Sequence, residues 1–394
     1  FLFFRRKVFR VNYFLLDKLI ILFFLLVLLT GFINDYFVLN KLFWKGSFST
    51  TLKSFLFLKY LLFYIVLRFL IENRIINLKI FFFTCALGSI FVCFDIFYQL
   101  AFGADIFGFE IIGSGRKLGG PFGDELIAGS YIQRFSIFSF FIIPIFLSNL
   151  SQRYLKYTIP ILFLIFFVGI LLSGNRMPLI LFLLSICLIV LFQKQTRKYF
   201  ISFIVFFSII FLLIINFNKN IKVNFLSFYD QISKMYLVIT SDNINVTTPV
   251  YFKQFATFYD TWLMNKYIGG GIKSFRYYCH TRPNIERDSD FVCNMHPHNY
   301  YLEVLTETGV MGFIIITSIF LIVIYNSLYK KYFSKNNFSN NHEIIPFIFL
   351  LLVEIFPIKS TGSFFTTGNT TYLFLIMGIL VGLSKRENFI EKRN

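Results

Sequence analysis

The fold of this chain is decided by stretches such as Leu19-Ile20-Ile21-Leu22-Phe23-Phe24-Leu25-Leu26-Val27-Leu28-Leu29, which contain no polar side chain. This one lies within a longer apolar stretch over residues 14–33, and a helix needs about 20 mostly apolar residues to cross a bilayer. Of the 394 residues, 57% are hydrophobic, and the mean hydropathy is +0.69. A soluble domain of this length could not bury so much apolar surface. We therefore predict an all-α, polytopic integral membrane protein.

Ten apolar stretches predict about 10 transmembrane helices, and one long polar loop follows the seventh. The predicted organisation is seven helices within residues 1–216, a loop over 217–298, and three helices within 299–394. The first stretch lacks a small-residue cleavage site, so we expect a retained helix rather than a signal peptide. No internal repeat is visible, which argues against the transporters that are built from repeated halves. The ten stretches are 14–33, 54–71, 79–101, 125–147, 157–173, 177–192, 200–216, 299–325, 344–358 and 370–384.

The distribution of basic residues predicts the topology. The formal charge is +18, and Lys and Arg concentrate at both ends of the chain and in alternate loops. The positive-inside rule then places both termini in the cytoplasm and the 217–298 loop on the outer face. Charge in such loops also contacts lipid headgroups. No basic and aromatic module for nucleic acid is visible, so we expect membrane lipids and no nucleic acid as its partner.

An arginine stands at a predicted helix start on the outer face, in the turn Ser173-Gly174-Asn175-Arg176. Its planar guanidinium could bind a phosphate group through paired hydrogen bonds. The alternative is an interfacial arginine that contacts lipid headgroups, and for this turn taken alone that alternative is favoured roughly two to one.

A second outward segment, residues 111–134, combines Arg116 with several glycines that permit close approach of the backbone to a ligand. Asp124 and Glu125 fall at a predicted helix start, where capping and a functional role remain equal alternatives. Arg134 would lie about 15 Å into the span. Because an intramembrane arginine is unfavourable unless it is paired, we expect it to face the bundle interior, with Asp95 as a candidate partner.

Two cysteines, Cys279 and Cys293, lie in the long loop. An outward loop is in an oxidising environment, so we predict a disulfide between them. Closure of about 15 residues would stabilise the fold by ~3 kcal/mol and restrain the approach to the histidines that follow. The alternative is a metal site built from Cys279, Cys293 and three histidines, His280, His296 and His298. Their spacing fits no standard zinc pattern, so we expect no metal.

The polar loop returns to the membrane through a run from His296 to Gly312 that contains two histidines and two carboxylates. Glu303 and Glu307 are four residues apart and share one helix face. Two carboxylates early in a membrane helix require a polar cavity. A histidine beside a membrane is usually structural, but beside buried carboxylates and outward arginines His298 is a candidate base, because its pKa is near neutrality.

Three segments resemble the bacterial O-antigen ligase and O-antigen polymerase family, which also contains protein O-oligosaccharyltransferases. The run from His298 to Gly309 is similar to the histidine motif of that family. Ser173–Arg176 resembles its arginine turn, and residues 116–128 resemble its Arg, Gly-Phe-Gly and acidic stretch. The order of the three segments and their shared outward side also agree, and the resemblance spans roughly residues 79–325.

The resemblance implies a membrane glycosyltransferase of cell-surface polysaccharide biosynthesis in the bacterial inner membrane. An undecaprenyl-pyrophosphate-linked glycan would be the donor, another glycan or a lipid A-core the acceptor, and transfer would occur on the periplasmic face without a cofactor. His298 would be the catalytic base, and three arginines would bind the donor pyrophosphate. Four further residues would support the site. The pyrophosphate ligands are Arg116, Arg176 and Arg276, and the supporting residues are Glu303, Glu307, Arg134 and His296.

Two alternatives from other classes remain. A polysaccharide transporter or flippase would need polar residues through the membrane midplane and usually has paired halves, whereas the polar residues here gather on one face. A non-catalytic membrane protein of envelope assembly would retain its function without His298. The motifs do not separate a ligase from a polymerase, because the two share motifs and differ in their acceptor.

Overall fold

The computed structural model describes residues 14–39, 48–111, 117–146, 152–193, 197, 212–213, 216, 219–240, 250–282, 293, 296–328, 342–359 and 362–391, and the regular elements in these ranges are helices joined by turns and loops. Within these ranges an isolated bridge between Ala104 and Glu110 is the single piece of β-type pairing. The all-α prediction is therefore confirmed. The chain forms two compact units, and both are discontinuous in sequence. The first contains residues 1–76, 248–338 and 354–394, and the second contains 77–247 and 339–353.

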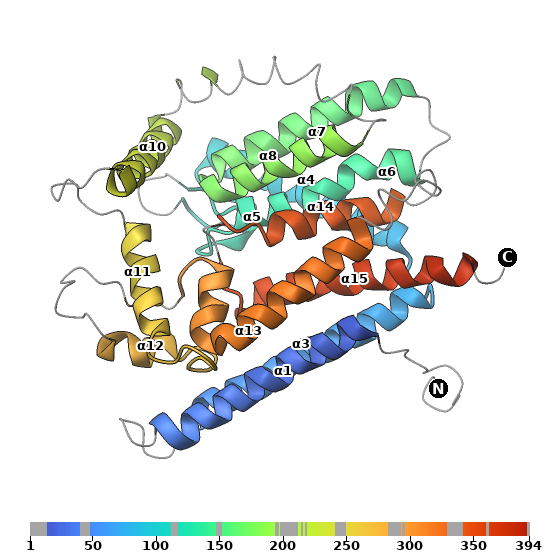
Figure 1. Ribbon diagram of the computed structural model, residues 1–394. Helices are drawn as coiled ribbons and strands as arrows, with labels where there is room; N and C mark the ends of the chain where they lie inside the picture. Colours follow the sequence, from blue (N-terminus) through green and yellow to red (C-terminus); the bar gives the residue numbers. More distant parts are fainter. Residues whose placement is uncertain are drawn as a thin grey trace. The chain divides into compact units, whose positions relative to one another are not determined.

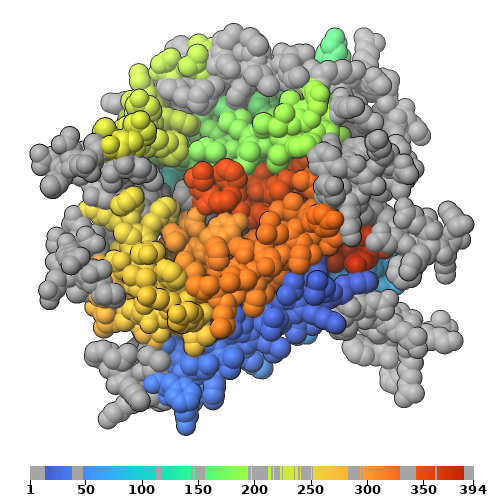
Figure 2. Space-filling model, in the orientation of Figure 1, coloured from blue at the N-terminus to red at the C-terminus, as the bar shows by residue number. Residues whose placement is uncertain are grey.

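Long helices form the first unit. Helix α1 (Leu15–Ile33) continues into a π-helical turn, η2 (Asn34–Leu39), and α3 (Ser49–Glu72) lies beside it (Figure 1). Helix α3 also packs against α15 (Thr367–Glu391), and α13 (Tyr300–Ile324) contacts both α1 and α11 (Val250–Trp262). The short α12 (Phe275–Tyr278) and η5 (Cys279–Thr281) follow α11. In Figure 2, α1, α11 and α13 present a continuous surface on the face shown.

A buried charge cluster ties α1 to α3. The guanidinium of Arg68 pairs with Asp17 of α1 and with Glu72 one turn further along α3, at 2.8 Å from Glu72. The hydroxyl of Tyr64 donates at 2.9 Å to the same carboxylate oxygen of Asp17 that pairs with Arg68. Because Arg68 and Asp17 are both buried, each would be strongly unfavourable without the other. The cluster thus fixes the register of the two helices at the end opposite to η2.

The second unit begins with α4 (Leu78–Phe102) and continues through α7 (Gln152–Leu172), α8 (Arg176–Phe192) and α10 (Lys219–Thr240). Phe82, Phe138 and Phe347 pack ring against ring in its core, with centroids 4.9–5.8 Å apart. Phe347 comes from α14 (Ile345–Glu354), which follows η7 (His342–Ile344). Between α4 and α7 lie four short elements: η3 (Gly120–Phe122), α5 (Ala128–Phe135), η4 (Ser136–Phe138) and α6 (Ser139–Phe146).

In the described part of the chain, five helices are long and apolar enough to cross a membrane: Leu15–Phe37, Ser49–Glu72, Leu78–Phe102, Tyr300–Leu328 and Thr367–Lys385. Three shorter apolar helices, Lys156–Leu172, Arg176–Phe192 and Ile345–Glu354, coincide with three more predicted stretches. The fourth predicted stretch, 125–147, is not one continuous helix, because the 3₁₀ turn η4 separates α5 from α6. Most of the seventh stretch, 200–216, lies outside the described residues. The count of ten helices, the division at residues 216 and 298, and the outward loop stay predictions.

Candidate active site

The histidine run enters α13 through a capped helix start. Asn299 adopts an extended backbone conformation, and its side-chain oxygen accepts hydrogen bonds from the N–H groups of Tyr301 and Leu302. Its side-chain nitrogen donates to the carbonyl of Pro357 at 2.9 Å, which holds the start of α13 against the chain that precedes α15. An asparagine at this position satisfies N–H groups that have no partner within the helix. The cap therefore places His298 immediately before the positive end of α13.

His298 is held in an unusual conformation beside a second histidine. Its φ of 55° lies in the left-handed region, which non-glycine residues rarely occupy unless the surrounding structure enforces it. The rings of His296 and His298 meet edge to face, with centroids 4.4 Å apart. Burial lowers the pKa of His298 below its ordinary value. For His296, burial and then the charges of His298 and Lys273 lower the pKa to about 4. Both imidazoles are therefore neutral at neutral pH, the form in which a base accepts a proton.

Helix α13 is broken at Gly309, where φ is 66° and ψ is −171°. The segment over residues 266–271 enters this break. Val310 and Met311, whose N–H groups lose their helical acceptors, donate instead to the carbonyls of Lys266 at 2.9 Å and Tyr267 at 3.2 Å. The carbonyls of Thr306 and Glu307, which those N–H groups would have reached, accept from Gly270 at 3.1 Å and Gly271 at 2.7 Å. Two backbone bonds of the helix, from Val310 to Thr306 and from Met311 to Glu307, are thus replaced by four bonds to a neighbouring segment.

The glycines in both segments permit this exchange. Gly269 and Gly309 both have positive φ, and a Cβ on either would overlap the backbone of the opposite segment. A Cβ on Gly271, also at positive φ, would lie 2.5 Å from the Cγ2 of Thr50 on α3. The Gly-Gly-Gly sequence and the Thr-Glu-Thr-Gly sequence are therefore two halves of one contact. Without backbone approach this close, the residues after Gly271 could not reach the carboxylates of α13.

Lys273 is the first charged side chain after this contact, and no role was predicted for it. Its backbone is left-handed, with φ of 61°. The ammonium lies 3.5 Å from a carboxylate oxygen of Glu303 and 3.1 Å from the hydroxyl of Ser363. Ser363 in turn donates to Glu303, and the N–H of Phe364 donates to the other carboxylate oxygen at 2.6 Å. Glu303 therefore links α13 to Lys273 and to residues 363–364, which are far apart in the sequence.

Glu307 lies one turn further along α13 in a different situation. Its side chain is buried and, in the described part of the chain, no side chain donates a hydrogen bond to its carboxylate, which lies beside the backbone N–H of Lys273. The charges of Glu303, Lys273 and Lys53 act on it. Native structures leave few buried polar atoms unsatisfied, and such atoms are concentrated at functional sites. The predicted shared face of Glu303 and Glu307 is real, but the two carboxylates have different surroundings.

A second buried ion pair adjoins the start of α13. The ammonium of Lys359 lies 2.5 Å from Glu354, and both side chains are buried. The hydroxyl of Tyr300 donates to Glu354, while Lys359 also donates to that hydroxyl at 3.1 Å and lies 4.3 Å from the centre of the ring. Tyr300 is therefore buried at the start of α13. Partners more than fifty residues apart leave no local signal, so this network could not be predicted.

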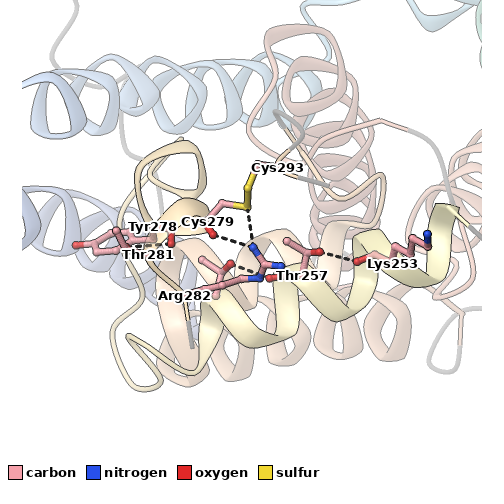
Figure 3. The surroundings of a disulfide bond; sticks show 8 residues. Lys253, Thr257, Tyr278, Cys279, Thr281, Arg282 and Cys293 are labelled. Carbon is pink, nitrogen blue, oxygen red and sulfur yellow. Dashed lines mark hydrogen bonds between the residues drawn. A yellow bond between two sulfur atoms is a disulfide. The ribbon is translucent and has the colours of Figure 1, made fainter. Parts of the chain in front are cut away.

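Cys279 and Cys293 are joined in a disulfide, with Cα atoms 5.7 Å apart (Figure 3). Arg282 lies against it and donates to the carbonyl of Cys279 at 3.0 Å. Phe258 and Phe275 stack beside Cys279 with ring centroids 3.5 Å apart. Because both sulfur atoms are in this bond, the alternative metal site has no thiolate ligands. Among the described residues no three His, Cys, Asp or Glu side chains are grouped as metal ligands.

The predicted arginines divide between the two units. Arg276 is exposed on α12, in the unit that contains His298. Arg176 begins α8 in the other unit, and its guanidinium lies 5.8 Å from the centre of the Phe228 ring. Arg134 stands in the last turn of the short α5 in that same unit. Arg116 lies outside the described residues. Asp95, the suggested partner of Arg134, accepts a hydrogen bond from the N–H of Ile106 at 2.9 Å.

The family model described as O-antigen ligase matches residues 161–317. This region contains the Arg176 turn, the disulfide, the segment over residues 266–271, and α13 as far as the turns beyond its break. A search of curated proteins finds no match. The apolar helices and the family match together identify a membrane protein. The resemblance seen in the sequence is confirmed over residues 161–317, the part of the chain that is similar to the O-antigen ligase family.

Proposed function

We propose that this protein is a membrane glycosyltransferase that moves a glycan from an undecaprenyl-pyrophosphate donor to an acceptor hydroxyl. The observation that carries the proposal is the state of His298. It is a neutral imidazole held in a strained backbone conformation at the mouth of α13, inside the region that matches the O-antigen ligase family. A neutral imidazole in a fixed position suits a general base. The acceptor would be another glycan or a lipid A-core.

In the proposed reaction, the acceptor oxygen attacks the anomeric carbon of the donor glycan. His298 takes the proton of the attacking hydroxyl as the new glycosidic bond forms. The bond between the anomeric carbon and the pyrophosphate oxygen breaks, and undecaprenyl pyrophosphate leaves with the electron pair. Atoms and charge balance without a cofactor. The negative charge that develops on the leaving group requires cations nearby.

Arginines are the proposed source of that positive charge. Arg116, Arg176 and Arg276 would bind the pyrophosphate, because the guanidinium fork matches phosphate oxygens. The partial exposure of Arg176 at the first turn of α8 supports this role. The N–H groups at that helix start would add to the attraction. Arg134 would add a further positive charge to these three arginines.

The supporting residues would act on the position of the base. Glu303 and Lys273 hold residues 363–364 against α13, and Asn299 holds the chain near Pro357. His296 packs against the ring of His298 and limits the directions in which that ring can point. Glu307 is a buried carboxylate to which no side chain donates a hydrogen bond in the described part of the chain. We assign these residues positioning roles rather than contact with the reacting atoms.

The site is proposed to face the periplasm, with both termini in the cytoplasm and the protein in the bacterial inner membrane. The excess of Lys and Arg in alternate loops supports this orientation. The disulfide supports it as well, because disulfides persist in oxidising compartments. The test fuses a reporter enzyme that works only in the cytoplasm after residue 260. Activity of this reporter would contradict the orientation.

The test is transfer by purified protein in liposomes that contain an undecaprenyl-pyrophosphate glycan. His298→Ala and Arg176→Ala should each abolish transfer while the protein still inserts. His280→Ala changes an exposed histidine that directly follows Cys279. It serves as the matched control and should show normal transfer. A transporter would give a different result. Neither the wild-type protein nor His298→Ala would transfer glycan, and both would move the donor across the bilayer at the same rate. Offering lipid A-core and a second glycan unit in separate reactions distinguishes a ligase from a polymerase.

A further inference from the structure

Helix α4 exposes a continuous stripe of large apolar side chains. Leu87, Phe91, Phe94, Tyr98 and Phe102 recur at intervals of three or four residues, and each is at least 42% exposed. That spacing places them on one face of the helix. Because α4 is one of the helices long and apolar enough to cross a membrane, the face that carries this stripe is suited to contact lipid acyl chains.

The chain after α4 folds back as a compact hairpin over residues 103–111. Ala104 and Glu110 form an antiparallel bridge, and the N–H of Ile111 donates to the carbonyl of Gly103 at 3.2 Å. At the tip, Asp105 organises the turn. Its carboxylate accepts from the N–H groups of Phe107 at 3.0 Å and Phe109 at 2.7 Å. The N–H groups of Asp105 and Gly108 form backbone bonds across the same turn.

Two polar residues of α4 attach this hairpin to the helix. Asp95 accepts from the N–H of Ile106 at 2.9 Å, and Gln99 donates to the carbonyl of Phe109 at 3.2 Å. Both side chains are buried although they belong to a membrane-crossing helix. One carboxylate oxygen of Asp95 and the amide nitrogen of Gln99 thus hold the hairpin, and the amide oxygen of Gln99 accepts from the N–H of Gly120 at 3.0 Å. These bonds explain why an apolar span tolerates the two polar side chains.

The hairpin folds back alongside α4, so that its tip lies beside an earlier part of the helix. The ring of Phe107 lies 6.4 Å from the ring of Phe91, centroid to centroid. Phe91 precedes the last residue of α4, Phe102, by eleven positions, which corresponds to roughly 16 Å along the helix at ~1.5 Å per residue. The tip of the hairpin therefore lies beside the apolar stripe and not beyond the helix end.

We propose that the hairpin over residues 103–111 is a re-entrant membrane element that inserts Ile106, Phe107 and Phe109 among lipid acyl chains. These three side chains are 53%, 62% and 48% exposed and continue the stripe of α4. Irregular backbone is unfavourable in lipid unless its polar groups are satisfied within the protein. All five N–H groups from Asp105 to Phe109 donate to protein acceptors.

The proposal is tested with nitroxide labels in liposomes of phosphatidylethanolamine and phosphatidylglycerol. The parent carries Cys187→Ser, since Cys187 is the exposed free cysteine of the described residues. Labels are placed at Phe107→Cys, at Glu110→Cys on the base of the hairpin, and at Asp124→Cys on an exposed acidic residue. Collision with dissolved oxygen reports acyl chains, and collision with a water-soluble nickel complex reports water.

The label at residue 107 should collide with oxygen several-fold more often than with nickel, the label at 110 less so, and the label at 124 should show the opposite preference. Adding Asp95→Ala should raise nickel collision at residue 107, whereas Asp95→Asn, which keeps an acceptor oxygen, should not. Preferential nickel collision at residue 107 in the parent would overturn the proposal. Low collision with both probes would also overturn it, because it would show that protein, such as a second copy of the chain, covers the hairpin.

Discussion

The ammonium group of Lys273 lies 3.5 Å from the carboxylate of Glu303, and the Glu303 side chain is fully buried. The two residues meet because the segment that ends at Gly271 exchanges backbone bonds with the break in α13. One contact therefore links the glycine-rich approach, the two carboxylates of α13 and the chain that leads into α15.

Lys273→Met should destabilise the protein by roughly 3 kcal/mol, because it leaves the Glu303 carboxylate buried without its cation. Glu303→Gln should be milder, since the amide oxygen can still accept from the N–H of Phe364 while the amide nitrogen can donate to the hydroxyl of Ser363. In the double variant the loss should be smaller than the sum of the two single losses, because neither charge remains. Thermal unfolding in detergent measures all three. Strict additivity would show that the pair is not coupled.

Gly309→Ala should destabilise α13 and reduce transfer. The backbone at Gly309 lies in a region that is essentially restricted to glycine and costs about 1–3 kcal/mol for a residue with a Cβ, and that Cβ would overlap the carbonyl of Tyr267. Gly368→Ala is the matched control, since Gly368 lies in a helix and a Cβ there would have no heavy atom within 4 Å. Thermal unfolding and transfer rates are compared for both variants. Equal unfolding temperatures would mean that the break does not require glycine.

Stability should fall as the pH is lowered from about 6.5 to 4, in part through His296. The pKa of His296 is about 4 in the folded protein and near 6.5 when the chain unfolds. Between these values the unfolded chain binds a proton that the folded protein does not, so acid favours unfolding. His296→Gln should flatten the dependence of the unfolding temperature on pH in this window. His280→Gln, which changes an exposed histidine, should leave the slope unchanged.

Replacing both Cys279 and Cys293 by serine should reduce the free energy of unfolding by ~3 kcal/mol, the value expected for a closed loop of this length. The unfolding temperature should fall accordingly. A reducing agent should lower the unfolding temperature of the wild-type protein and leave that of the double variant unchanged. Cys187→Ser should have no effect in either condition, because Cys187 is a free cysteine. A wild-type protein indifferent to reductant would show that the bond does not stabilise the fold.

Apolar length predicted most of the helices but not where one of them breaks. The stretch over residues 125–147 looks like one span, yet it contains Gln133, Ser136 and Ser139, which are buried around the turn η4. Their burial depends on tertiary packing that periodicity does not report. Capping by Asn299 could be anticipated from its residue type and position.

The candidate site was predicted where a single segment carried the signal. His296, His298 and the shared face of Glu303 and Glu307 follow from one run of sequence. Lys273 and Ser363 escaped prediction, because they are ninety positions apart and meet only once the chain has folded. The sequence offered one clue, a lysine two residues after three glycines. The glycines indicated a close approach, but nothing in the sequence identified α13 as the element approached.

The central claim is that His298 is the base for glycan transfer, and the most direct measurement is the initial rate of transfer against pH for wild-type protein and for His298→Ala. The wild-type rate should hold at pH 6.5 and fall at lower pH, because burial lowers the pKa of His298 and the base must be neutral. His298→Ala should show no transfer at any pH until free imidazole, supplied in the assay, restores part of the rate. Full activity of His298→Ala without imidazole would contradict the account.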